Sequence, residues 1–265
     1  MAKVWFVGAG PGDVDLITVK GRSLIQQAGA ILYAGSLVNP AHLQFAPPSC
    51  LTADSSSMTQ QEMVNWLSQQ ANRHSVVVRL QTGDPSLFGA MNELIWPLRE
   101  AHIEVEVVPG VSSALAAAAF AQQPLTLPEI SQTVIFTRVE GRTACPDNQQ
   151  LHQLASHDAT LCLFLSATLG KKITSELLQA GWPAHTPMLL IHRVSYPDQR
   201  LVHTTLQELA ATLKKEGMTG QTMIIAGPSV SVHQQGESTP SRLYAPDFSH
   251  GFRHTPQPHR RTPHE

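Results

Sequence analysis

Apolar residues in the first half of the chain fall in short runs separated by longer amphipathic stretches. The runs are rich in β-branched residues, which is typical of buried strands, and the stretches between them repeat apolar positions at helical spacing. The pattern predicts strands at Val4–Val7, Ala30–Tyr33, Val76–Leu80 and Glu104–Val108. It predicts helices at Thr18–Gln27, Gln60–Arg73 and Phe88–Arg99. Strands that alternate with helices favour an α/β fold, with a largely parallel sheet covered on both faces.

The second half repeats the alternation of strands and helices. Small residues at 116–119, followed by Pro124 and Pro128, indicate a helix and a linker between the two halves. The approach of the last two strands predicts some antiparallel pairing. Strands are predicted at Thr133–Thr137, Thr160–Leu165, Met188–His192, Leu201–Thr205 and Thr222–Ile225, and helices at Leu151–Ser156, Lys171–Ala180 and Leu206–Glu216.

These elements predict two α/β domains and a tail. A chain of 265 residues is long enough for two modest domains, since one domain takes roughly 150 residues. The tail is rich in Gly, Ser, Pro and His and lacks periodicity, so we expect it to be partly disordered. We predict an N-terminal domain over 1–116, a linker over 117–130, a C-terminal domain over 131–235 and the tail over 236–265.

Composition and charge narrow the classes of function. The formal net charge of -2 disfavours nucleic acid as a partner, and any anionic ligand must be bound by local cationic side chains. The longest apolar run, Ala114–Ala121, is well short of the roughly 20 residues that span a bilayer, so no membrane partner is expected. Three scattered cysteines without C-x-x-C spacing argue against structural zinc and fit a reducing cytosol, so we expect a cytoplasmic protein.

Three glycine-containing loops follow predicted strands of the first half. The first, Gly8-Ala9-Gly10-Pro11-Gly12-Asp13, lacks the third glycine of a dinucleotide fingerprint. No acidic residue lies between Leu16 and Ala53 to bind a ribose, which also argues against that fingerprint. The loop is therefore either a tight turn between strand and helix or a place where backbone approaches a ligand closely.

The second and third loops each allow a structural and a functional interpretation. In Gln81-Thr82-Gly83-Asp84-Pro85, Asp84 is either a helix N-cap or a carboxylate that binds a ribose diol or lies near a sulfonium. In Pro109-Gly110-Val111-Ser112-Ser113, a serine caps the next helix, or small side chains let a flat adenine or a methionine tail lie against the backbone.

A further candidate segment is Thr137-Arg138-Val139-Glu140-Gly141-Arg142-Thr143, which follows the first strand of the second half. Its two arginines are suited to bidentate binding of carboxylates, and solvated loop charges are the alternative. The sequence contains no P-loop, no G-x-S-x-G elbow and no H-E-x-x-H motif, so phosphoryl transfer through a P-loop and the standard hydrolase and zincin mechanisms lack their anchors.

Taken in order, these loops resemble the tetrapyrrole methylase superfamily over nearly the whole chain. The loops at 8–13 and 82–85 are shared across that superfamily and indicate only its fold and methyl donor. The segments Tyr33–Leu37 and Thr137–Thr143 are similar to those of the cobalt-precorrin-4 and precorrin-4 C11-methyltransferases of cobalamin biosynthesis, and residues 241–250 resemble the end of anaerobic-pathway members. Ala34 stands where sister uroporphyrinogen methyltransferases carry an acidic residue, so no catalytic base is assigned.

The resemblance implies two α/β domains with S-adenosylmethionine in the cleft between them, a homodimer, and methylation of carbon 11 of a corrin precursor. No protein-bound metal is implied, and any cobalt belongs to the substrate. By motif position, the donor pocket should include Pro11, Gly83, Asp84, Leu87, Ser112, Ser113, Leu165, Val194 and Ala226. Lys20, Arg138 and Arg142 should hold the carboxylate arms of the macrocycle, and Tyr196 is either a turn residue or faces the macrocycle.

Two alternatives follow from the same residues. One keeps the fold and changes the acceptor to another tetrapyrrole carbon, or to RNA or protein as in distant relatives; the mildly acidic balance disfavours RNA. The other is a non-catalytic carrier of a cobalt-corrinoid, with the histidines of the tail, His250, His254, His259 and His264, as the metal ligands.

Overall fold

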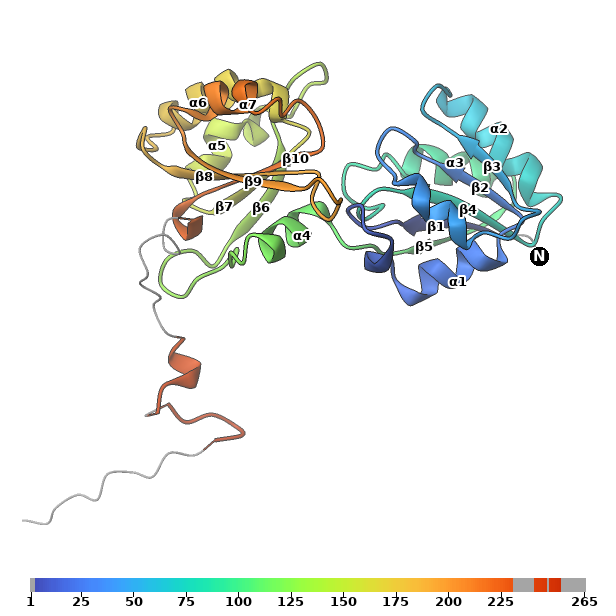
Figure 1. The fold of residues 1–265 in the computed structure, drawn as a ribbon, viewed down its shortest axis with the longest axis horizontal. Helices are drawn as coiled ribbons and strands as arrows, with labels where there is room; N and C mark the ends of the chain where they lie inside the picture. Colours follow the sequence, from blue (N-terminus) through green and yellow to red (C-terminus); the bar gives the residue numbers. More distant parts are fainter. Residues whose placement is uncertain (1–2, 231–240, 247, 254–265) are drawn as a thin grey trace, which may run out of the picture.

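The computed structural model describes residues 3–230, 241–246 and 248–253, which form two five-stranded sheets lying side by side (Figure 1). The order of strands is β3-β2-β4-β1-β5 in the first sheet and β6-β7-β10-β8-β9 in the second. Each sheet with its covering helices is called a unit below. The α/β class predicted from the alternation of strands and helices is confirmed.

The first sheet is parallel throughout. Three of its four predicted strands are reproduced with ends that shift by at most a residue or so, and the fourth is extended at both ends of Val4–Val7. The edge strand β3 is not predicted, because its sequence L-T-A-D is short and mostly exposed and so carries no apolar pattern. The strands are β1 (Lys3–Gly8), β2 (Ala30–Tyr33), β3 (Leu51–Asp54), β4 (Val76–Gln81) and β5 (Glu104–Val108).

Helices cover both faces of the first sheet (Figure 1). Helix α1 (Val19–Gln27) packs on one face, and α2 (Gln60–Ala71) and α3 (Asn92–Glu100) pack on the other. The predicted start of the third helix at Phe88 is wrong: Phe88 and Ala90 have φ angles of 53° and 47°, which are incompatible with a right-handed helix, so α3 begins at Asn92.

The second sheet is mixed. Only β6 and β7 are parallel, and the other three pairs are antiparallel. The predicted antiparallel pairing is therefore confirmed, but the last two strands are not neighbours, because β10 inserts between β7 and β8. The strands are β6 (Val134–Arg138), β7 (Thr160–Phe164), β8 (Pro187–His192), β9 (Arg200–Thr205) and β10 (Thr222–Ala226).

The two faces of the second sheet are covered differently. Helices α5 (Leu151–Ala155), α6 (Gly170–Gln179) and α7 (Leu209–Lys215) bury one face, and the alanine-rich α4 (Ser113–Phe120) buries the other. Because α4 runs across the predicted domain boundary at 116 and packs on the second sheet, we propose that the division between the units lies before Ser113. The remaining domain limits stay predictions.

Short 3-10 helices complete the described chain. They are η1 (Val14–Leu16), η2 (Pro40–Phe45), η3 (Asp147–Gln149), η4 (Ala167–Leu169) and η5 (Arg242–Tyr244). The last of these lies away from both sheets in Figure 1. Most of the predicted disordered tail, including His254, His259 and His264, lies outside the described residues. Within the described ranges, no helix has both the length and the apolar character needed to cross a membrane.

Candidate functional site

A cavity of about 330 Å³ lies between the two units. Its walls are built by the loops that follow β1, β2, β4 and β5 on one side, and by the loops that follow β7 and β8, with the start of β10, on the other. Ligands of open α/β sheets bind at the carboxyl ends of the strands, where the first four loops lie. The volume falls in the range of roughly 300–1,000 Å³ found for small-molecule sites.

All but one of the residues predicted for the donor pocket line this cavity. Those that line it are Pro11, Gly83, Asp84, Leu87, Ser112, Ser113, Leu165 and Val194. Ala226 is the exception, because it is fully buried in the core beneath α5, α6 and α7. Since β10 runs antiparallel to β7, its start at Thr222 faces the cavity and its end at Ala226 points away. The donor contact predicted for Ala226 stays a prediction.

Two kinds of glycine occur in the predicted loops. A Cβ atom placed on Gly8 would lie 2.6 Å from the Cα of Gly110, so these two glycines allow the backbones after β1 and β5 to pack together. Gly83 has a φ of 60°, and a Cβ atom there would meet no heavy atom closer than 3.9 Å. A side chain at position 83 would therefore enter the cavity, and its absence leaves room for a ligand beside the backbone.

Asp84 presents a carboxylate in the cavity wall. It does not cap α3, which begins eight positions further along; its oxygens accept hydrogen bonds from the Ser86 amide at 2.8 Å, the Gly110 amide at 2.9 Å and the Ser86 hydroxyl. Partial burial acts to raise the pKa of Asp84, but these hydrogen bonds outweigh burial and hold its pKa below the usual value. The site therefore keeps a negative charge at neutral pH.

Ser112 combines both of the roles considered from the sequence. Its hydroxyl accepts a hydrogen bond from the Ala114 amide at 3.3 Å, which caps α4, and the residue also lines the cavity. Ser113 lines the cavity as the first residue of α4. The capping and ligand-binding interpretations of this loop are thus compatible, because the start of α4 forms part of the wall.

Apolar side chains from both units meet at the cavity. The ring centroids of Phe88, from the first unit, and Phe164, from the second, are 5.1 Å apart. Leu165 lies next to them; the residue is 66% exposed and has a φ of 53°, an uncommon conformation for leucine. A large apolar side chain exposed in a cavity wall is suited to contact a ligand.

The three cations predicted to bind the macrocycle do not line the cavity. Lys20 lies on the outer side of α1, with its Nζ 5.0 Å from the Trp5 ring and 3.7 Å from a Glu106 oxygen. Arg138 donates hydrogen bonds to the carbonyl oxygens of Thr143 and Ala144 and so holds its own loop together. Arg142 is exposed at the end of that loop. Arg138 ends β6 and Arg142 follows it, and β6 is an edge strand of the second sheet.

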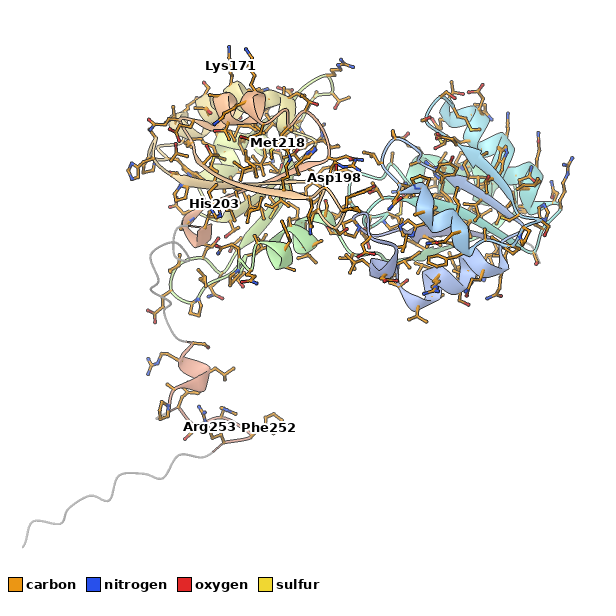
Figure 2. All side chains as sticks on the ribbon, in the orientation of Figure 1. Lys171, Asp198, His203, Met218, Phe252 and Arg253 are labelled. Carbon is orange, nitrogen blue, oxygen red and sulfur yellow. The ribbon has the colours of Figure 1, made fainter. Side chains whose placement is uncertain are left out.

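Two residues of the turn after β8 line the cavity; Arg193 is not assigned to a ligand from the sequence, and Tyr196 is either a turn residue or faces the macrocycle. Arg193 is the one cation among the described residues that line the cavity, and Tyr196 lines it too. The Arg193 Nε lies 2.8 Å from Asp198, and its Nη1 lies 2.7 Å from the Gln221 side-chain oxygen. Figure 2 shows Asp198 on the side of the second unit that faces the first, with His203 of β9 further away. The sequence does contain a signal for Arg193: it stands directly after a predicted strand and shortly before Tyr196-Pro197-Asp198.

Groups of three or more His, Cys, Asp or Glu side chains arranged to hold a metal ion are absent from the described part of the chain. Cys162, one of the three free cysteines, is buried in the core beneath α4, and burial raises its pKa to about 12. It is therefore a packing residue and takes no part in the cavity.

Comparison with known proteins identifies the family. Tetrapyrrole (corrin/porphyrin) methylases match residues 3–210. The cobalt-precorrin-4 C(11)-methyltransferase of Priestia megaterium is 42% identical over 95% of this chain and 97% of its own. A solved cobalt-precorrin-4 methyltransferase, a cobalamin biosynthetic enzyme, has a TM-score of 0.84 at 42% identity, with 86% of this chain and 96% of that chain covered.

A more distant structure adds a ligand. The uroporphyrin-III C-methyl transferase of Thermus thermophilus, complexed with S-adenyl homocysteine, has a TM-score of 0.71 at 31% identity, with 87% of this chain and 94% of that chain covered. The family match reaches into both units and covers the cavity lining from Pro11 to Tyr196, whereas the lining residues 219–223 lie beyond it. This chain therefore belongs to the tetrapyrrole (corrin/porphyrin) methylase family.

Proposed function

We propose that this protein transfers a methyl group from S-adenosylmethionine to carbon 11 of cobalt-precorrin-4. The products are the precorrin-5 level intermediate and S-adenosylhomocysteine. The observation that carries the proposal is the 42% identity to a cobalt-precorrin-4 C(11)-methyltransferase over nearly the full length of both chains. The cavity between the units, with its carboxylate, serines and apolar wall, supports it.

The residues of the cavity fit an S-adenosyl donor. Gly83 leaves open space beside the backbone, and the ionised Asp84 can bind a ribose diol or lie near a positive charge. Leu87, Leu165 and Val194 offer apolar contacts to an adenine or a methionine chain. When bound, the donor supplies a methyl group on a positively charged sulfur, which is already activated for transfer to a carbon nucleophile.

The task left to the protein is alignment. Orientation of two bound reactants can supply about 7–11 kcal/mol of the barrier, provided that the reacting atoms are held close and in line. We assign the carboxylate arms of the macrocycle to Arg193, in place of Lys20, Arg138 and Arg142, because it is the lining cation. Phe88 and Phe164 form an aromatic part of the cavity wall.

The proposal includes a cytoplasmic homodimer: the cytoplasmic location rests on the scattered cysteines, and the dimer rests on the family resemblance. Sedimentation equilibrium measures the subunit number directly. A concentration-independent mass of one chain would contradict the dimer and leave the reaction unaffected.

The reaction is tested by anaerobic incubation with S-adenosylmethionine and either cobalt-precorrin-4 or precorrin-4, followed by mass spectrometry. We expect the cobalt form to gain one methyl group while S-adenosylhomocysteine is released. Methylation of the metal-free form alone would assign the protein to the aerobic pathway. If the donor binds and neither form is methylated, the acceptor is another tetrapyrrole carbon or another substrate.

A further inference from the structure

The turn after β8 joins the two units at the cavity. The Ser195 hydroxyl accepts a hydrogen bond from the Asp13 amide at 2.9 Å, and the Tyr196 hydroxyl donates one to the Leu37 carbonyl oxygen at 3.3 Å. Asp13 ends the glycine-rich loop after β1, and Leu37 belongs to the loop after β2. One short segment of the second unit therefore contacts two loops of the first unit.

The Tyr196 ring occupies the space that a side chain at position 12 would need. A Cβ atom on Gly12 would lie 2.2 Å from Cε2 and 2.4 Å from Cδ2 of this ring. Gly12 is not among the glycines with positive φ, so its own backbone conformation accepts alanine. Gly12 is thus required by contact with Tyr196 and not by a ligand or by a left-handed turn.

The Tyr196 ring also stacks with Arg193, whose guanidinium carbon lies 4.2 Å from the ring centroid. Arg193 is fixed in turn by Asp198 and Gln221. The ring therefore contacts both the glycine-rich loop and a cation that is itself held by two side chains.

We propose that Tyr196 is a positioning residue that sets the width of the cavity by holding the turn after β8 against Gly12. Pro11 and Leu37, on the first unit, and Arg193 and Val194, on the second, line the cavity beside this contact. Their separation, and with it the alignment of donor and acceptor, depends on the ring. This inference rests on the proposed function, in that the cavity binds an S-adenosyl compound.

The test is a double-mutant cycle read by the affinity of S-adenosylhomocysteine in isothermal titration calorimetry. Tyr196→Ala should raise its Kd about tenfold or more, equivalent to about 1.4 kcal/mol. Tyr196→Phe keeps the ring and should stay within about threefold, since the one hydrogen bond that it loses is long. Gly12→Ala should weaken binding as Tyr196→Ala does, because the ring is displaced.

The double variant Gly12→Ala/Tyr196→Ala should bind no more weakly than Tyr196→Ala, because the clash is gone. Gly251→Ala is the matched glycine control, since a Cβ atom there meets nothing within 4 Å, and it should leave the Kd unchanged. Additive losses in the double variant would overturn the contact between positions 12 and 196. Lower thermal stability with unchanged affinity in Tyr196→Ala would show a purely structural role and overturn the positioning role.

The assay separates this inference from the proposed function. If the wild-type protein binds S-adenosylhomocysteine but methylates neither macrocycle, the acceptor is wrong and the affinity cycle still decides the role of Tyr196. If the wild-type protein does not bind S-adenosylhomocysteine, both fail. With an active enzyme, Tyr196→Ala should also lower kcat at saturating donor and acceptor, and Tyr196→Phe should restore it.

Discussion

Asp84 shows how one side chain organises the donor side of the cavity. Its carboxylate ties the loop after β4 to the Gly110 amide after β5, so it links two neighbouring loops while keeping its charge. Asparagine would keep one oxygen, for the Ser86 or the Gly110 amide, and would lose the charge and the hydrogen bond to the other amide. Asp84→Asn therefore tests the charge together with one of these hydrogen bonds.

We expect Asp84→Asn to raise the Kd of S-adenosylmethionine on the order of tenfold or more, since hydrogen bonds to charged groups are worth about 1.5–3 kcal/mol. Titration calorimetry measures this, with Asp15→Asn, an exposed carboxylate of η1, as the control. An unchanged Kd in Asp84→Asn would show that this carboxylate does not contribute to donor binding.

The pH dependence of donor binding follows from the direction of the shift. The pKa of Asp84 is held below its ordinary value of 3.8, so the charged form persists as the pH falls and is lost only as the pH approaches that lowered value. The contribution of Asp84 to affinity should therefore be constant from pH 8 to about pH 5. A loss of affinity that is centred near pH 6 and absent in Asp84→Asn would contradict this assignment.

Arg193 and Arg142 can be compared directly as candidate ligands of the macrocycle, the first from the structure and the second from the sequence. Because Arg193 lines the cavity and Arg142 does not, Arg193→Gln should raise the KM of the macrocycle by about tenfold, the scale of one charge-assisted contact, and Arg142→Ala should leave it within about twofold. Steady-state kinetics with the donor held saturating measures both. A larger rise in KM for Arg142→Ala than for Arg193→Gln would assign the binding of the carboxylate arms to the loop after β6.

At the scale of elements, α2 begins with a complete capping box. The Thr59 hydroxyl accepts a hydrogen bond from the Glu62 amide, and the Glu62 carboxylate accepts one from the Thr59 amide at 2.7 Å. The helix buries Val64 and Leu67 against the first sheet. Its start is therefore set by local hydrogen bonds, and its orientation is set by the apolar face.

Thr59→Ala should lower the free energy of unfolding by about 1 kcal/mol, the usual cost of losing an N-cap. Urea denaturation measures it. Gln61→Ala, at an exposed position in the first turn of α2, is the control. It should change the free energy of unfolding by less than about 0.5 kcal/mol. Since neither residue lines the cavity, donor affinity should be unchanged in both variants.

At the scale of the whole molecule, the cavity depends on both units and on none of the described tail. Its lining extends from Pro11 to Met223, and η5 lies away from both sheets (Figure 1). Arg253 donates hydrogen bonds to Leu243, Ala245 and Phe248, so the described tail residues contact one another. Figure 2 shows Arg253 and Phe252 far from the sheets.

A chain that ends at residue 236 should therefore bind S-adenosylhomocysteine with a Kd within about twofold of the full chain. The same variant tests the carrier alternative. Loss of cobalt retention on truncation, with no methyl transfer by the full chain, would favour a corrinoid carrier whose ligands lie in the tail. Retained methyl transfer in the truncated chain would exclude a catalytic role for the tail histidines.

What the sequence determined by itself is local. Runs of β-branched residues predict β2 and β5 to the residue, and Thr18 and Thr59 begin helices, because these features depend on neighbours within one turn or one strand. The loops after β1, β4 and β5 are candidates for ligand binding from the sequence, because parallel strands place their carboxyl ends on one edge of the sheet.

What only the tertiary structure decided depends on residues far apart in the chain. Ala226 lies at the end of β10 away from the cavity because β10 inserts antiparallel between β7 and β8. Gly12 is required by the ring of Tyr196, more than 180 positions later, and Arg193 replaces Arg142 at the cavity. Local patterns carry no information on which loops of two separately folded sheets come into contact, since that contact is set by the packing of one unit against the other.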